Sequence, residues 1–457
     1  MNPFKYGETV NGENFCRRPE LSRTLRGYVE AGQNVVIQGE RRMGKTSLVL
    51  ETVRGMKGIA VFHADLFCVR DTADLCRRLA SALARFEDSA GFLEKMLNAL
   101  SRLRPTLSID PNTGSPTVSV DAKAAADLTS LETVLDAIIA HTAKRKSCVI
   151  LDEFQDILDI EDGERIIAIM RGRIQLDTKT SYIFLGSVRN KMTDIFMHPN
   201  SPFYRGAAPL PVGEIDADDF YKFLKSRSAT GKRKLLRPAF DAVRNIARNT
   251  PGDIQELCDA IWACSDDGQD ISEKEVRKGL EVIFSRERDH YEIFIRRLTA
   301  LQMRVLATLA SKGGREIFSV GFLSAASVLN AASAKRAIDR LVSDGLVFYN
   351  DREYRFVNPI FRERPVLLGF RGVCPRWFKG RKPCKAADTS SHQPILCLRH
   401  GKEMVQRGNP RTWPETSQGR RASPACRSLL LLHSHYAAVQ ALTWPQGNQS
   451  PSVLYGL

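Results

Sequence analysis

Short apolar runs alternate with stretches of helical period along the first half of the chain. Four runs rich in β-branched and aromatic residues, at 34–38, 59–66, 148–151 and 182–185, have the length of buried strands. Between them apolar residues recur at helical spacing, as over residues 72–104. Because parallel strands need crossover connections, this alternation predicts an α/β fold with a parallel sheet covered by helices on both faces.

The second half of the chain has mostly helical period. Acidic residues at 216–219 begin one predicted helix, and residues 237–248 and 252–264 supply two more, which predicts a small helical lid. A third region begins with a helix at 299–310. Two further helices follow, the last at 331–341, and lead into two short strands that turn at Asn350 and Asp351. The order of three helices and a hairpin predicts a winged helix.

Another hairpin is predicted at 107–120, where two alternating runs flank a Pro-Asn-Thr-Gly turn. It is either a finger that contacts a partner or DNA, or a packing or spacer element. Its tip lacks Lys, Arg and aromatic residues, which favours the packing role.

Residues 39–46 read G-E-R-R-M-G-K-T and fit the phosphate-loop pattern G-x-x-x-x-G-K-[ST]. The loop lies between a predicted strand and a helix, so its backbone N–H groups and the positive helix end point at one place, where a polyphosphate fits. The alternative is an ordinary surface glycine turn. The residues expected to bind nucleotide are Gly39, Glu40, Arg41, Arg42, Met43, Gly44, Lys45, Thr46 and Ser47.

The strand at 148–151 ends in two carboxylates, Asp152 and Glu153. We expect Lys45 to contact the β- and γ-phosphates, and Thr46 and Asp152 to bind Mg²⁺. Glu153 is then the group that orients and polarises the attacking water. Together the two motifs predict a protein that binds and hydrolyses a nucleoside triphosphate.

The net charge of +15 is unevenly distributed. After Pro365 there are 13 Lys and Arg residues against three acidic ones, which leaves only +5 for the rest of the chain. The high pI is therefore a weak argument for DNA binding. At 457 residues the chain is long enough for two or three domains.

Ten cysteines lie at scattered spacings, and four of them, Cys68, Cys76, Cys148 and Cys258, fall on predicted apolar faces. Free thiols are typical of a reducing cytosol. The N-terminus has no apolar signal region, and no apolar run reaches the length of a membrane span. We therefore expect a soluble cytoplasmic protein.

Over residues 12–363 the chain resembles AAA+ ATPases of the archaeal and bacterial ATPase-domain family. These are relatives of the STAND signalling ATPases and, more distantly, of origin-recognition ATPases. The resemblance is carried by GERRMGKTSL, LDEFQ, FLGSVR, SPFYR and YRFVNPIFRE. It implies that the nucleotide is ATP, used with Mg²⁺.

The resemblance also implies two further site residues. Ser187, at the end of the fourth strand, matches the sensor that hydrogen-bonds the γ-phosphate or the attacking water; a buried serine without that role is the alternative. Arg205 matches an arginine finger that reaches a neighbouring subunit, which would require a homo-oligomer. A solvated loop arginine is the alternative, and Arg189 competes for the role.

Two departures from the family pattern are evident. Gln255 stands where many members carry a sensor arginine in the lid. The segment at 15–21, which resembles the family's base-binding entry motif, is one residue short.

Lys335, Arg336 and Arg340 lie on one side of the expected recognition helix, with Ile338, Leu341 and Val342 toward the core. This pattern suits duplex DNA, but it equally suits a wing that docks on protein or regulates the lid.

After Glu363 the periodicity disappears and acidic residues become rare. We expect residues 364–457 to be a basic tail of low order that binds anions or, more simply, an altered reading frame or fusion. A zinc site is disfavoured by the spacings of the tail's Cys and His residues, which are Cys374, Cys384, His392, Cys397 and His400.

The domains expected are a nucleotide-binding core at 1–214, a lid at 215–297 and a winged helix at 298–363. The leading hypothesis is an oligomeric AAA+ ATPase that couples hydrolysis to movement of the lid and winged helix on a client. One alternative is an ATP-dependent signalling switch or scaffold with little turnover. Another is a DNA-binding ATPase acting as a loader or mobile-element helper.

Overall fold

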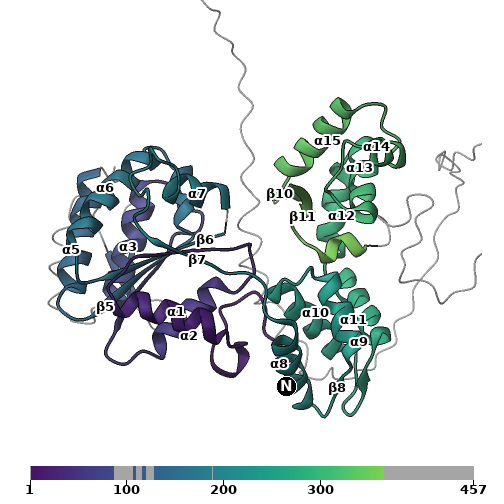
Figure 1. Ribbon diagram of the computed structural model, residues 1–457, viewed down its shortest axis with the longest axis horizontal. Coiled ribbons are helices and arrows are strands. Elements are labelled where there is room, and N and C mark those ends of the chain that lie inside the picture. Colours follow the sequence, from purple (N-terminus) through teal and green to yellow (C-terminus); the bar gives the residue numbers. More distant parts are fainter. Residues whose placement is uncertain are drawn as a thin grey trace, which may run out of the picture. The chain divides into compact units, whose positions relative to one another are not determined.

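The computed structural model describes residues 2–86, 106–109, 116–119, 128–187, 189–350 and 352–364 (Figure 1). The expected tail, its zinc alternative and the end of the helical stretch at 72–104 lie outside these residues.

Five parallel strands form the central sheet, in the order β2-β5-β6-β1-β7. The strand β5, which pairs with β2, and the strand β6, which pairs with β1, are buried along their whole length. This burial explains why the sequences of β5 and β6 are continuous apolar runs. The four strands expected from the sequence are confirmed, and β7 is added at the edge. The strands are β1 (Val35–Gln38), β2 (Ala60–Asp65), β5 (Ser147–Asp152), β6 (Ser181–Gly186) and β7 (Ala208–Pro211).

Helices cover both faces of the sheet, as predicted (Figure 1). Alternate strand residues enter two separate cores, because successive side chains point to opposite faces: Val35 and Ile37 pack toward one layer and Val36 toward the other. The first layer contains α1 (Pro19–Glu30) and α2 (Lys45–Arg54). The second contains α3 (Thr72–Phe86), α5 (Leu128–Thr142), α6 (Gly163–Leu176) and α7 (Arg189–Phe196).

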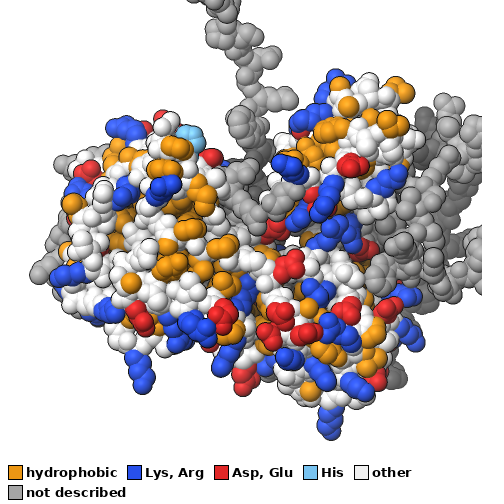
Figure 2. Space-filling view, in the orientation of Figure 1, with side chains coloured by type: hydrophobic (Ala, Val, Ile, Leu, Met, Phe, Trp, Pro, Cys, Tyr) orange, Lys and Arg blue, Asp and Glu red, His pale blue; other side chains and the backbone are white. Residues whose placement is uncertain are grey.

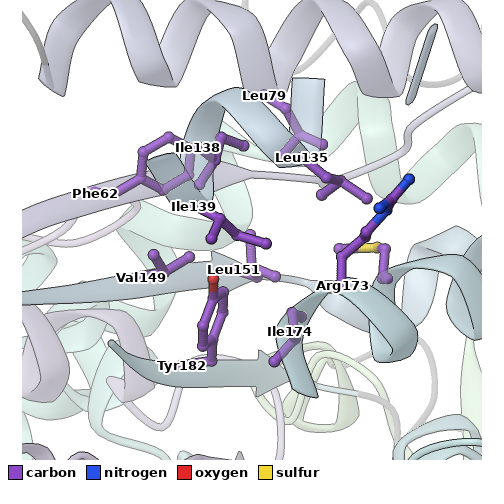
Figure 3. Close-up of a pocket in the computed structure, with 11 residues that line it drawn as sticks. Phe62, Leu79, Leu135, Ile138, Ile139, Val149, Leu151, Arg173, Ile174 and Tyr182 are labelled. Carbon is purple, nitrogen blue, oxygen red and sulfur yellow. The ribbon is translucent and has the colours of Figure 1, made fainter. Parts of the chain in front are cut away.

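A cavity of about 10 Å³ lies in the second core, between the sheet and α3, α5 and α6 (Figure 3). Phe62, Val149 and Leu151 line it from the strands, and Leu79, Leu135 and Ile174 from the helices. Space of this size holds about one water molecule, and its lining is apolar. The cavity is a packing gap and not a ligand site.

The hairpin expected at 107–120 is confirmed: β3 (Thr106–Ile109) and β4 (Pro116–Ser119) pair antiparallel. Its tip lies outside the described residues, so the packing role stays a prediction.

Four helices and two short strands form the predicted helical lid. Asp216 caps its first helix by accepting hydrogen bonds from the backbone N–H groups of Asp218 and Asp219, as the acidic run suggested. The N-terminal segment contributes Phe4 and Cys16 to the lid core. The elements are α8 (Ala217–Ala229), β8 (Lys234–Leu235), α9 (Arg237–Ile246), α10 (Pro251–Ala263), β9 (Asp270–Ile271) and α11 (Glu273–Arg286).

The last described region has the expected order of three helices and an antiparallel hairpin, preceded by one helix that the sequence did not predict. Ile338 and Leu341 are buried, but Val342 is 38% exposed, so its expected core position is wrong. It lies in the last turn, where the helix face leaves the core. The elements are α12 (Arg288–Arg297), α13 (Ala300–Lys312), α14 (Val320–Ala325), α15 (Ala331–Ser343), β10 (Val347–Asn350) and β11 (Glu353–Phe356).

Cys76, Cys148 and Cys258 are buried, as expected. Cys68 is exposed instead, because it follows β2 in a turn with a left-handed φ of 52°. Within the described ranges, none of the helices combines the length and the apolar character needed to cross a bilayer.

Candidate phosphate-binding site

The phosphate loop connects β1 to α2, as the motif predicts. Gly44 is the N-cap of α2 and has φ 78°, a left-handed conformation that glycine adopts without strain. The Lys45 ammonium, which is buried, donates hydrogen bonds to the carbonyl oxygens of Gly39 (3.1 Å) and Glu40 (2.9 Å). Burial lowers the pKa of Lys45, and the nearby carboxylates of Glu153 and Asp152 oppose that shift.

Thr46 and Asp152 meet at the end of the loop. The Thr46 hydroxyl donates a 2.6 Å hydrogen bond to Asp152 Oδ2, although the two residues are 106 positions apart. Burial alone would raise the pKa of Asp152, but the His63 imidazole and the Thr46 hydroxyl outweigh burial and lower it. A carboxylate and a hydroxyl in contact are the hard oxygen ligands that Mg²⁺ prefers.

His63 is a neighbour of this pair that the sequence did not single out. Its Nε2 lies 3.9 Å from Asp152 Oδ2, and its strand β2 is the direct partner of β5. In the sequence, the feature that could have identified His63 was its place near the carboxyl end of an apolar strand, because parallel sheets bind ligands at that end.

Glu153 follows the end of β5 with a left-handed φ of 50°. Its Oε2 accepts two hydrogen bonds of 2.7 Å, one from the Ser187 hydroxyl and one from Gln155 Nε2. Ser187 comes directly after β6, and both donors are buried. The structure therefore brings together the expected water-activating carboxylate and the expected sensor. Gln155 was missed as a site residue, although it lies in the LDEFQ motif.

Arg205 is not joined to these residues by any ion pair within the described part of the chain. Its backbone has φ 54°, its side chain is exposed, and its guanidinium lies 5.3 Å from the centre of the Tyr204 ring. The side chain of its competitor, Arg189, is outside the described residues. An exposed arginine held by an aromatic ring is compatible with both alternatives from the sequence.

The N-terminal segment borders the loop. The buried Arg18 guanidinium donates to the carbonyl oxygens of Met43 (2.8 Å) and Gly213 (2.9 Å), and Val10 N–H donates to the Ser47 hydroxyl (3.1 Å). Burial lowers the pKa of Arg18. The base-binding role of residues 15–21 stays a prediction.

Two side chains of the loop, Glu40 and Arg42, contact residues far along the chain. Glu40 Oε1 accepts hydrogen bonds from Asn350 Nδ2 (2.8 Å) and Arg355 Nη1 (3.2 Å) of the C-terminal hairpin. Arg42 pairs with Asp253 (2.5 Å) and Glu256 (2.6 Å) of α10. The loop backbone remains available for phosphate, but these two side chains are engaged elsewhere.

The basic residues of α15 lie on its exposed side, as expected. Lys335 pairs with Asp339, Arg340 pairs with Asp344 at 3.1 Å, and Arg336 donates to the Ser333 hydroxyl at 3.3 Å. Two of the three cations are thus already neutralised by acids one turn away. Basic and acidic side chains are likewise intermingled on the visible face of the helical lid (Figure 2).

No family model and no curated protein matches the sequence. Among solved structures, the chain is similar to a Walker-type ATPase of Pyrococcus abyssi, with 17% identity, a TM-score of 0.55, and 80% of this chain and 99% of that one covered. The fold is that of an AAA+ P-loop ATPase. At this identity the likeness establishes the fold and not the activity.

Weaker likenesses are to the ORC1 protein of Aeropyrum pernix, solved in complex with DNA, and to the RuvB Holliday junction branch migration motor of Thermotoga maritima. They have 13% and 12% identity and TM-scores of 0.43 and 0.37. They cover 79% and 74% of this chain, and 94% and 89% of those chains.

Proposed function

We propose that this chain binds ATP with Mg²⁺ and hydrolyses it. The observation that carries the proposal is the 2.6 Å contact between Thr46 and Asp152, formed beside Lys45 and Glu153. A surface glycine turn and an unrelated Asp-Glu pair would have no reason to meet at the carboxyl ends of β1 and β5, two strands of one parallel sheet that β6 separates. In such sheets this edge is the ligand-binding edge.

The charge and position of each site residue indicate its role. Thr46 and Asp152 would hold Mg²⁺, which neutralises phosphate charge when it is bound. Lys45 would exchange its two loop carbonyl partners for phosphate oxygens. Glu153, oriented by Ser187 and Gln155, would orient water for attack in line with the leaving group.

A homo-oligomer is the second part of the proposal. Arg205 has no ion-pair partner among the described residues and lies in an exposed loop before β7. Such a residue is suited to reach the γ-phosphate of a neighbouring subunit, where arginine fingers contribute about 10³-fold or more to the rate. The lid and the winged helix, at 215–297 and 298–363, would couple this cycle to a client.

ATP turnover by the full chain tests the proposal. Wild type should release phosphate only with Mg²⁺, Lys45→Ala should lose ATP binding, and Glu153→Gln should bind ATP but keep it unhydrolysed. Loss of binding in Lys45→Ala is expected because the Lys45 ammonium, bonded to the loop carbonyls of Gly39 and Glu40, is the charge placed to meet the phosphates. Wild-type protein that binds no ATP would contradict the proposal.

A signalling switch with little turnover is a second candidate, favoured by the hydrogen bonds on Glu153. Its Oε2 accepts from both Ser187 and Gln155, so this oxygen is engaged before any water arrives. In a switch, wild type and Glu153→Gln would retain bound ATP equally long. In an ATPase, only the variant would retain it.

A further inference from the structure

Arg42 joins the phosphate loop to the lid. Its backbone has φ 63°, an uncommon conformation for a residue with a side chain, and one that marks local constraint. Gly252 N–H, in the first turn of α10, donates to Arg42 O at 3.0 Å. In return, Arg42 Nη2 donates to Gly252 O at 3.3 Å. Backbone and side chain of one loop residue thus bind the same helix end.

Two carboxylates of α10 hold the Arg42 guanidinium. Asp253 and Glu256 are three positions apart and therefore lie on one helix face. The planar guanidinium can serve two carboxylates at once, which an ammonium does less well. The Asp253 side chain is 2% exposed, so this carboxylate depends on its partner for solvation.

The loop and the helix approach so closely that the contact requires glycine. A Cβ on Gly252 would lie 2.9 Å from Arg42 Cβ and 3.2 Å from Arg42 O. Any larger residue there would push α10 away from the loop. The contact is therefore built into the backbone of both partners.

Arg42 immediately precedes the backbone N–H groups that a phosphate would use. Its dihedral angles set the direction of the Met43 and Gly44 amides, which lead into the N-terminus of α2. A bound phosphate and the α10 contact therefore act on the same short stretch of backbone. The lid has Gln255 at the position where many family members carry a sensor arginine. In this chain the arginine, Arg42, is on the loop, and its carboxylate partners, Asp253 and Glu256, are on the lid.

We propose that Arg42 is a positioning residue that couples phosphate binding in the loop to the position of α10. This inference rests on the proposed ATP binding. It assigns the lid's response to nucleotide to a loop arginine rather than to a residue of the lid. The neighbouring Arg41 makes no ion pair with the described residues and supplies the matched comparison.

A double-mutant cycle in the full chain tests the coupling, with a fluorescent ATP analogue and Mg²⁺ as the probe. Arg42→Ala and Glu256→Gln should each weaken binding about tenfold, and the double variant should be no weaker than Arg42→Ala alone. Arg41→Ala removes the same charge one position away. Because Arg41 is not expected to act through Glu256, the losses of binding caused by Arg41→Ala and by Glu256→Gln should multiply in the double variant. Arg42→Lys should restore binding only in part.

Hydrogen exchange of residues 251–263, with and without ADP, gives a readout that a purely structural role would not move. Nucleotide should protect this segment in wild type and Arg41→Ala, and should not protect it in Arg42→Ala or Glu256→Gln. If wild type binds the probe but the effects of Arg42→Ala and Glu256→Gln multiply, and protection persists, the coupling is disproved while ATP binding stands. If wild type binds neither nucleotide, both proposals fail.

Discussion

Ser187 donates a 2.7 Å hydrogen bond to Oε2 of Glu153, and so joins the ends of β5 and β6. Glu153 directly follows β5 and Ser187 directly follows β6, and both strands are buried along their whole length. The relationship defines the orientation of the carboxylate expected to direct water. It also identifies the side chain whose removal should affect turnover with little effect on ATP affinity.

We expect Ser187→Ala to lower kcat by about tenfold to a hundredfold with little change in KM, because one preorganised donor is lost. Steady-state ATP turnover measures both constants. Ser181→Ala is the matched control: Ser181 begins β6, the strand that Ser187 follows, is also buried, and donates to Gln33 O instead. Equal losses of kcat in the two variants would mean that Ser187 acts only through strand stability.

Mixing two inactive variants tests the role of Arg205. Arg205→Ala should bind ATP normally but turn it over about 10³-fold more slowly, because every site then lacks the arginine from the neighbouring subunit while its own phosphate loop is unchanged. Lys45→Ala should bind no ATP but still present Arg205. Mixed oligomers would then contain intact sites, so activity should return when the two are combined. Additive, near-zero activity in the mixture would rule out a finger supplied by another subunit.

The free energy of unfolding should depend on pH through the Asp253 carboxyl. Burial raises the pKa of this carboxyl to about 7, from an ordinary value near 4. Between these values the folded chain retains a proton that the unfolded chain has released. Raising the pH from about 4 to about 7 should therefore lower the free energy of unfolding by about 1.4 kcal/mol per pH unit through this group.

Urea denaturation of wild type and Asp253→Asn across this pH range isolates the contribution. The difference in unfolding free energy, wild type minus variant, should fall from pH 4 to pH 7 and level off above it. Other carboxylates, such as Asp74 with its lowered pKa, act with the opposite sign, but they are the same in both proteins. A difference that stays constant with pH would contradict the raised pKa.

Salt dependence of duplex DNA binding tests the basic face of α15. Because Lys335 and Arg340 are paired with Asp339 and Asp344, we expect Lys335→Ala/Arg340→Ala to change the slope of log K against log salt by less than about 0.5. Two cations that each released a counterion would contribute a change of about 2. The basic residues after Pro365 are shared by both proteins, so their contribution cancels. A change near 2 would support the DNA-binding alternative.

Much of the fold was accessible from the sequence. The apolar runs predicted four of the five sheet strands, and the period change after residue 215 predicted the lid, because burial on two faces and on one face leave different patterns. The hairpin signals at 107–120 and near Asn350 were also sufficient. Helix α12 was missed, and among its residues only Tyr291 is buried, so its apolar stripe is weak.

Part of the candidate site could likewise be predicted from the sequence, and part could not. The sequence by itself determined the phosphate loop, Lys45, Thr46, Asp152 and Glu153, because their chemistry depends on residue types at short, local spacings. Only the tertiary structure decided that Arg42 and Glu40 reach the lid and the C-terminal hairpin, and that Gln155 and Ser187 share Glu153. Those contacts join segments up to 315 positions apart, and local pattern carries no information about which distant side chains packing brings together.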